Sequence, residues 1–162
     1  MSSSIRLRAL ILIGSLALVA TACGGGETET STTATETGSG FGSPADPADA
    51  DRTVELAATD GLVFEPADFT VSPGETITFR IVNQGNVVHD FTLGDQAVQD
   101  QHEAEMEEMG DMVHDQPNAV TIPGGETVEL TWAFPESGTV LIGCHQPGHY
   151  AAGMKGQITV NG

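Results

Sequence analysis

The chain has 162 residues, of which 23 are acidic and only five are Lys or Arg, and its formal net charge is −18 at pH 7. Because contact with phosphates requires Lys and Arg, this charge excludes nucleic acid as a partner. The chain has only two cysteines, Cys23 and Cys144, so a fold held together by a framework of disulfides is excluded as well.

The N-terminal segment predicts an export signal at residues 1–22. Arg6 and Arg8 precede a twelve-residue apolar run, and small residues then lead to Cys23. The run is too short to span a bilayer. A cysteine at this point resembles the modified cysteine of bacterial lipoproteins. We therefore expect a lipid on Cys23 that anchors the chain in the cell membrane, with its domain on the extracytoplasmic side. Ordinary secretion, which would give a soluble secreted or periplasmic protein with a free thiol, is the alternative.

Residues 23–52 show no hydrophobic periodicity and are dominated by small, polar and acidic residues. Such a segment cannot bury enough apolar surface to offset the entropy lost on folding, so we predict that it is disordered. A flexible coil of this length has an end-to-end distance of about 30 Å. We expect it to act as a tether that holds the following domain clear of a membrane surface.

Residues 53–162 are sufficient for one small domain with a single core. Thr76–Val82 alternates between apolar and polar residues, which is typical of a half-buried strand. The expected strands are short and separated by turns, at 53–58, 69–72, 76–83, 87–93, 119–122, 127–134, 139–143 and 157–160. This rhythm predicts an all-β domain built as an antiparallel β-sandwich, with Trp132 in its core.

Residues 95–118 interrupt this rhythm with an acidic insertion. From Asp95 to Asp115 the chain carries eight acidic residues and no Lys or Arg. One helical face carries His102, Met106, Met109 and Val113. Gly110 weakens this helix by about 1 kcal/mol relative to Ala, so we predict a partly helical segment. It is either a flap whose Met stripe packs on the sandwich or a second, labile Cu(I) site. We expect His114, which lies off the stripe, to be exposed.

A short C-terminal stretch carries Cys144, His149 and Met154, with four residues between each pair. A thiolate, an imidazole and a thioether form a soft ligand set that favours copper cycling between Cu(I) and Cu(II). The turn dipeptide Pro147-Gly148 lets this stretch fold around one point. His89, on another expected strand, is the candidate for the missing ligand. Two His, one Cys and a weak axial Met make a blue-copper electron-transfer site. Zinc is the alternative metal, and the Met argues against it.

The Cys-x4-His-x4-Met run, together with His89 before Asp90-Phe91, resembles the small cupredoxins of the plastocyanin, azurin and auracyanin type over about residues 53–162. The resemblance implies a Greek-key β-sandwich. It also implies one copper ion per domain, held by His89, Cys144, His149 and Met154. Electrons would pass through the more exposed His149, inside an apolar rim formed by Pro147, Tyr150, Ala151 and Ala152.

Two residues beside the expected ligands need separate treatment. The residue after the upstream His is often Asn or Ser in this family, and here it is Asp90. A carboxylate there would be repelled by the thiolate unless it accepts backbone N–H bonds. His145 follows Cys144 directly, and we leave it out of the site because neighbouring strand residues point to opposite faces.

The leading functional hypothesis is a monomeric electron carrier between extracytoplasmic redox proteins. Residues 53–162 contain seventeen acidic side chains and two basic ones, so we expect a partner with a basic docking surface. The alternative is a copper-handling protein that buffers or delivers copper with the Met/His insertion. An oxidase or nitrite reductase would need further histidine clusters, and the chain has five His in total, so we do not expect an enzyme.

Overall fold

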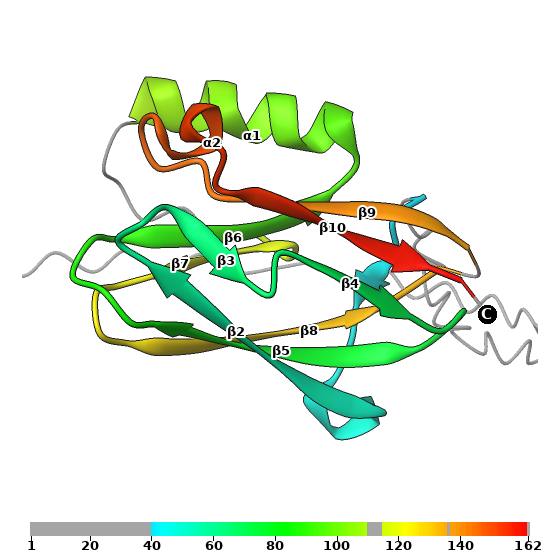
Figure 1. Ribbon diagram of the computed structural model, residues 1–162. Helices are drawn as coiled ribbons and strands as arrows, with labels where there is room; N and C mark the ends of the chain where they lie inside the picture. The colour runs from blue at the N-terminus through cyan, green and yellow to red at the C-terminus, as the bar shows by residue number, and fades with distance from the viewer. Residues whose placement is uncertain (1–39, 110–114, 136, 162) are drawn as a thin grey trace, which may run out of the picture. The chain divides into compact units, whose positions relative to one another are not determined.

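The computed structural model describes residues 40–109, 115–135 and 137–161. In this part of the chain, two five-stranded sheets pack face to face (Figure 1). The first sheet has the order β1 (Ser43–Pro44), β8 (Thr127–Ala133), β5 (Thr76–Asn83), β2 (Arg52–Thr59) and β3 (Val63–Glu65). The second has the order β4 (Asp68–Val71), β10 (Lys155–Val160), β9 (Gly138–Gly143), β6 (His89–Gly94) and β7 (Ala119–Ile122). The predicted all-β sandwich is confirmed.

Two strand pairs add a feature that the antiparallel prediction did not contain. β2 pairs with β5 and β4 pairs with β10 in parallel register, whereas the other pairs between the described strands are antiparallel. A parallel pair needs a crossover connection. The chain provides one between β2 and β5, because it crosses to the second sheet as β4 before it returns.

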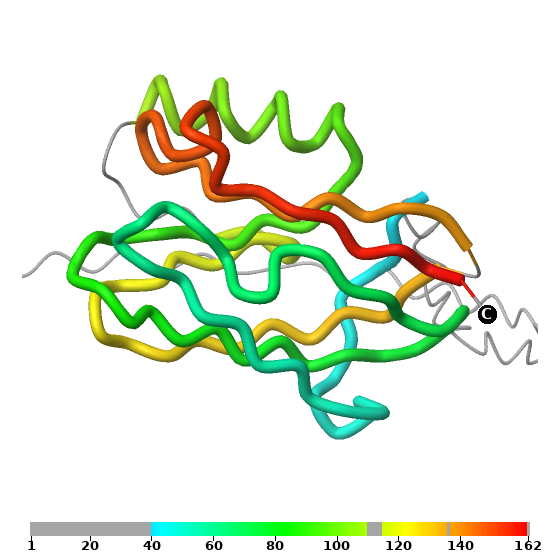
Figure 2. Tube along the Cα trace, viewed as in Figure 1, coloured from blue at the N-terminus to red at the C-terminus, as the bar shows by residue number. Residues whose placement is uncertain are grey.

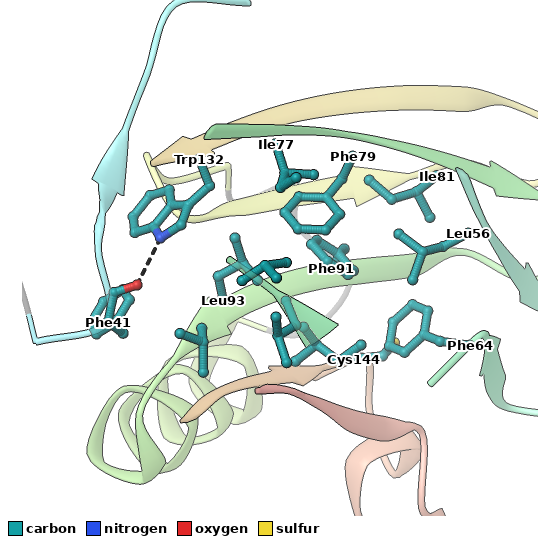
Figure 3. Packing of buried hydrophobic residues seen from close by; sticks show 14 of the residues in the cluster. Phe41, Leu56, Phe64, Ile77, Phe79, Ile81, Phe91, Leu93, Trp132 and Cys144 are labelled. Carbon is teal, nitrogen blue, oxygen red and sulfur yellow. Dashed lines mark hydrogen bonds between the residues drawn. The ribbon is translucent and has the colours of Figure 1, made fainter. Parts of the chain in front are cut away.

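The core lies between the two sheets and is built by alternation along the strands (Figure 3). Ile77, Phe79 and Ile81 of β5 are fully buried, as their spacing predicts. Phe79 packs against Phe91 of β6, with ring centroids 5.3 Å apart. Trp132 is also buried, as expected, and its Nε1–H donates to a backbone carbonyl at 2.9 Å.

The ordered domain begins earlier than the predicted boundary at residue 53. Phe41 stacks on Trp132 with ring centroids 5.6 Å apart, and its carbonyl accepts the indole hydrogen bond (Figure 3). Ser43–Pro44 then pairs with β8, and a 3₁₀ turn, η1, follows at Pro47–Asp49. The prediction of disorder is therefore wrong for residues 40–52. The predicted signal peptide, Cys23 and the rest of the tether lie outside the described residues. None of the helices in the described part has the length and apolar character needed to cross a membrane.

The insertion forms helix α1 (Gln96–Met109), which lies over β6 and β9 of the second sheet (Figures 1 and 2). The carboxylate of Asp95 accepts the Val98 N–H at 3.0 Å at the start of the helix. The predicted acidic, partly helical insertion is confirmed. His102 and Met106 are buried and Met109 is half-buried, as the stripe predicts. Val113 and His114 lie outside the described residues.

Candidate metal centre

The fold brings the predicted ligands to one end of the sandwich. His89 opens β6, Cys144 follows β9, and His149 begins the short helix α2 (His149–Ala152). The antiparallel register of β6 and β9 pairs Thr92 with Gly143, and so carries Cys144 to the beginning of β6. The fold therefore supplies the upstream His that the C-terminal stretch lacks.

Three ligand atoms converge at this point. Nδ1 of His149 lies 3.3 Å from Sγ of Cys144, and Nδ1 of His89 lies 3.8 Å from the same sulfur. The two Nδ1 atoms are 3.3 Å apart. Among the described residues, this is the one group of three or more His, Cys, Asp or Glu side chains that could hold a metal ion.

Met154 is held beside this group by the backbone. Its N–H donates to the carbonyl of His149 and its carbonyl accepts the N–H of Cys144, both at 3.0 Å. The residue is fully buried. Gly148 (φ 83°) and Gly153 (φ 104°) flank α2 in left-handed conformations that favour glycine, and they allow the chain to double back between the ligands.

The electrostatics of the group suit a metal cation. Burial raises the pKa of the Cys144 thiol far above its usual range, and the negative charge of Asp90 raises it further. Burial lowers the pKa values of His89 and His149, and the proximity of His149 adds to the effect on His89. Both imidazoles are therefore neutral at pH 7, with electron pairs available for a metal. A bound cation would supply the positive charge that stabilises the Cys144 thiolate.

These donors fit copper. One thiol, two neutral imidazoles and a buried thioether form the soft set that copper uses in both oxidation states. His89 and Cys144 are fully buried, whereas His149 is half-buried. The expectation that His149 is the more exposed of the two histidines is confirmed.

Asp90 meets the condition set from the sequence. Its Oδ1 accepts the backbone N–H of His145 at 2.7 Å, and its own N–H donates to Sγ of Cys144 at 3.4 Å. It therefore ties together the two backbone segments that carry His89 and Cys144. His145 is not a member of the group, as expected, but it is buried and contacts α1, which the sequence did not reveal.

The surface around His149 is apolar. Pro147, Ala151 and Ala152 are exposed and Tyr150 is half-exposed, as the resemblance implied. The sequence analysis did not predict that the two residues before His89 also expose apolar surface. Val87 and Val88 are 43% and 42% exposed. Their position next to a ligand in an otherwise buried strand was the signal that could have found them.

The possible metal donors of the insertion, His102, Met106 and Met109, are arranged differently from those of the C-terminal stretch. Nε2 of His102 lies 3.7 Å from Oδ2 of Asp90, and its Nδ1 lies 3.8 Å from a carboxylate oxygen of Glu105. Met106 is buried and Met109 is half-buried. His102 thus faces the sandwich and the neighbouring acids.

Comparison with known proteins points to copper. A family model described as copper binding proteins, plastocyanin/azurin family, matches residues 50–161. Auracyanin-A of Chloroflexus aurantiacus is 32% identical over 176 residues, which cover 99% of this chain and 100% of that protein. The copper-resistant cuproprotein CopI of Rubrivivax gelatinosus is 41% identical over 119 residues, which cover 74% of this chain and 72% of that protein.

A solved structure agrees with these relatives. The dithionite-reduced auracyanin of Roseiflexus castenholzii aligns with a TM-score of 0.61 at 30% identity. The alignment covers 70% of this chain and 99% of that one. The β-sandwich is thus the fold of an auracyanin, and the group of converging donors lies within the matched residues 50–161.

Proposed function

We propose that this chain, which belongs to the plastocyanin/azurin family of copper-binding proteins, carries single electrons between extracytoplasmic redox partners. In this proposal one copper ion is held by His89, Cys144, His149 and Met154. The observation that carries it is the convergence of two Nδ1 atoms and one Sγ in a buried group with one ligand near the surface.

Bound copper would supply one-electron exchange between Cu(I) and Cu(II). The chain supplies the rest. The buried side chains of His89 and Cys144 keep water away, and the backbone bonds around Met154 restrain the loop. A ligand set that moves little needs little reorganisation when the oxidation state changes. The half-exposed ring of His149 offers a short route from the interior to a docked partner.

The surface supports a redox protein as the partner. The apolar rim around His149 can exclude water from a contact, and the exposed acids of α1, Asp100, Glu107 and Glu108, favour a basic docking surface. We also propose that the domain acts as a monomer, anchored outside the cytoplasmic membrane by a lipid on Cys23. Cys23→Ser should then release the chain from the membrane fraction, and equal retention of both forms would refute the anchor.

A second candidate function is copper handling. It is favoured by the relatives named copper-resistant cuproprotein CopI and by the Met and His side chains of α1. In that case the chain would buffer or deliver copper, and the electron transfer would be incidental.

The proposed function is tested by the absorption spectrum of the Cu(II)-loaded chain. We expect an intense visible thiolate-to-copper band that disappears on one-electron reduction and returns on oxidation. Cys144→Ser should abolish the band, whereas the matched control Cys23→Ser should keep it. A Cys144→Ser variant that retains the band would refute the site.

A further inference from the structure

Two of the proposed ligands are followed directly by buried polar residues. Asp90 follows His89 and is 3% exposed, and His145 follows Cys144 and is 1% exposed. Burying a polar side chain costs free energy unless hydrogen-bond partners satisfy it. Helix α1 provides groups that face both side chains.

His145 is held by α1 at both ring nitrogens. Its Nε2 lies 2.7 Å from Oε1 of Gln99, and its Nδ1 lies 2.5 Å from a carboxylate oxygen of Glu103. The Gln99 amide is itself fixed, because its NH2 group donates to the carbonyls of Thr92 and Leu141 at 3.2 and 3.3 Å. The imidazole of His145 cannot rotate without breaking both contacts.

The backbone before Cys144 is enclosed as tightly. A Cβ atom at Gly143 would stand 2.5 Å from Oε1 of Gln99 and 2.7 Å from the ring of Tyr150. That ring is in turn stacked on His145, with centroids 4.5 Å apart. Only glycine leaves room for α1 and Tyr150 to approach the strand at this position.

Asp90 connects the same helix to the thiol. Its Oδ2 accepts the hydroxyl hydrogen of Thr92 at 3.0 Å and lies 3.7 Å from Nε2 of His102. Its backbone N–H donates to Sγ of Cys144. The buried imidazole of His102 therefore faces a carboxylate that stands beside the proposed thiolate ligand.

The composition of the α1 contact argues against a helix that only covers the sheet. Such a helix buries an apolar stripe. In the described helix, the buried side chains are Gln99, His102 and Met106, of which two are polar. Both of the polar ones face the residues that follow the ligands, His145 and Asp90, and the amide of Gln99 also bonds to the backbone of β6 and β9.

We propose that Gln99, His102 and Glu103 form a clamp that positions His89 and Cys144 through Asp90 and His145, and that this clamp helps to set the reduction potential of the bound copper. The proposal rests on the type 1 copper function proposed above. Groups that form hydrogen bonds with metal ligands orient those ligands and tune the properties of the metal. Here the backbone N–H of Asp90 bonds to the sulfur of Cys144, and the clamp holds Asp90 and His145 in place. Without His102, the carboxylate of Asp90 is less compensated beside the thiolate, and this favours Cu(II).

The first test is potentiometric titration of the copper-loaded full chain. His102→Leu should lower the potential by about 59 mV, which is a tenfold change in the ratio of Cu(I) to Cu(II) affinities for a one-electron couple. His102→Gln, which keeps a polar N–H group at this position, and the exposed control Glu126→Gln should stay close to the unaltered chain. Adding Asp90→Asn to His102→Leu should move the potential back. An unchanged potential in His102→Leu overturns the proposal.

The second test is amide hydrogen exchange of the metal-free full chain, which does not depend on copper. Glu103→Gln should speed exchange of the backbone amide of His145 about tenfold and leave exchange of the β5 amides unchanged, because only local opening is affected. His102→Leu should also speed exchange of the His145 amide. If this variant speeds exchange of the β5 amides as well, the whole domain has become less stable, and the result for the milder Glu103→Gln is used instead. Unchanged exchange at His145 overturns the clamp. If Glu103→Gln speeds this exchange but the unaltered chain shows no visible band when loaded with Cu(II), the clamp is supported and only the proposed electron-carrier function is refuted.

Discussion

The C-terminal ligand loop and helix α1 offer similar donors but arrange them differently. The loop carries Cys144, His149 and Met154, and the sulfur and imidazole meet at 3.3 Å. α1 carries His102, Met106 and Met109 along a rod. An α-helix rises 1.5 Å per residue, so the backbones of His102 and Met109 are separated by about 10 Å along the axis. The helix therefore spreads its donors over about two turns, whereas the loop brings its sulfur and imidazole together.

The difference shows that soft donors alone do not define a copper site. The loop converges because its backbone reverses direction at glycines in left-handed conformations, Gly148 and Gly153. The helix lacks such a reversal between Gln96 and Met109, and its inward donors meet acids and the sheet. The path of the backbone therefore brings the donors of the loop together and leaves those of the helix spread along its length.

The largest expected effect comes from removing the donors of each region in turn. Cys144→Ser combined with His149→Gln should reduce copper binding from one ion per chain to none. His102→Gln combined with Met106→Leu and Met109→Leu should leave one Cu(I) per chain, because we expect donors that are spread along the helix not to hold an ion. The measurement is Cu(I) stoichiometry under anaerobic competition with a chelator. Two ions on the unaltered chain, with one lost in the helix variant, would break the comparison and favour copper handling.

A smaller effect sharpens the same comparison through stability. Met106→Ala should lower the free energy of unfolding of the metal-free domain by about 2–4 kcal/mol, because it empties a buried site. Met109→Ala is the matched control, and its half-buried side chain should cost clearly less. Urea unfolding measures both. Equal losses for the two variants would show that the stripe does not pack as the structure describes.

The smallest effect concerns the turn before His89. The carboxylate of Asp60 accepts the N–H groups of Val87 and Asn86 at 3.0 and 2.9 Å, and these bonds lower its pKa. A carboxylate whose pKa is lowered by folding stabilises the folded state at pH values above the ordinary pKa of the group. This stabilisation is lost as the pH falls through the lowered pKa. Asp60→Asn should therefore make the loss of stability below about pH 4 shallower. Unfolding measured across this range checks the slope, and an identical slope in both proteins would contradict the assignment.

The ligand set could be predicted because most of it is local. Cys144, His149 and Met154 fall within one short stretch, and His89 was the candidate for the missing ligand on another expected strand, at 87–93. Contacts between distant parts of the chain could not be predicted in this way. Phe41 reaches its partner Trp132 across 91 positions, and nothing near Phe41 in the sequence indicates that contact.

The clamp was hidden for the same reason. Helical spacing placed His102 on an inward face, but it could not say what that face meets. The contact depends on how α1 lies over β6 and β9, which is a property of the tertiary packing. His145 was left out of the site by strand alternation, and it lies outside the group of converging donors. Strand alternation could not show that the opposite face carries a second buried surface.

The burial of Cys144 affects the chemical reactivity of its thiol in the metal-free protein. Thiolates, and not thiols, react with oxidants and alkylating agents. The raised pKa keeps Cys144 protonated, and the side chain has no exposed surface. In the extracytoplasmic location that we propose, the metal-free chain would therefore resist formation of a mixed disulfide or a sulfenic acid at Cys144. The surroundings that hold the sulfur for copper would also preserve it chemically until copper arrives.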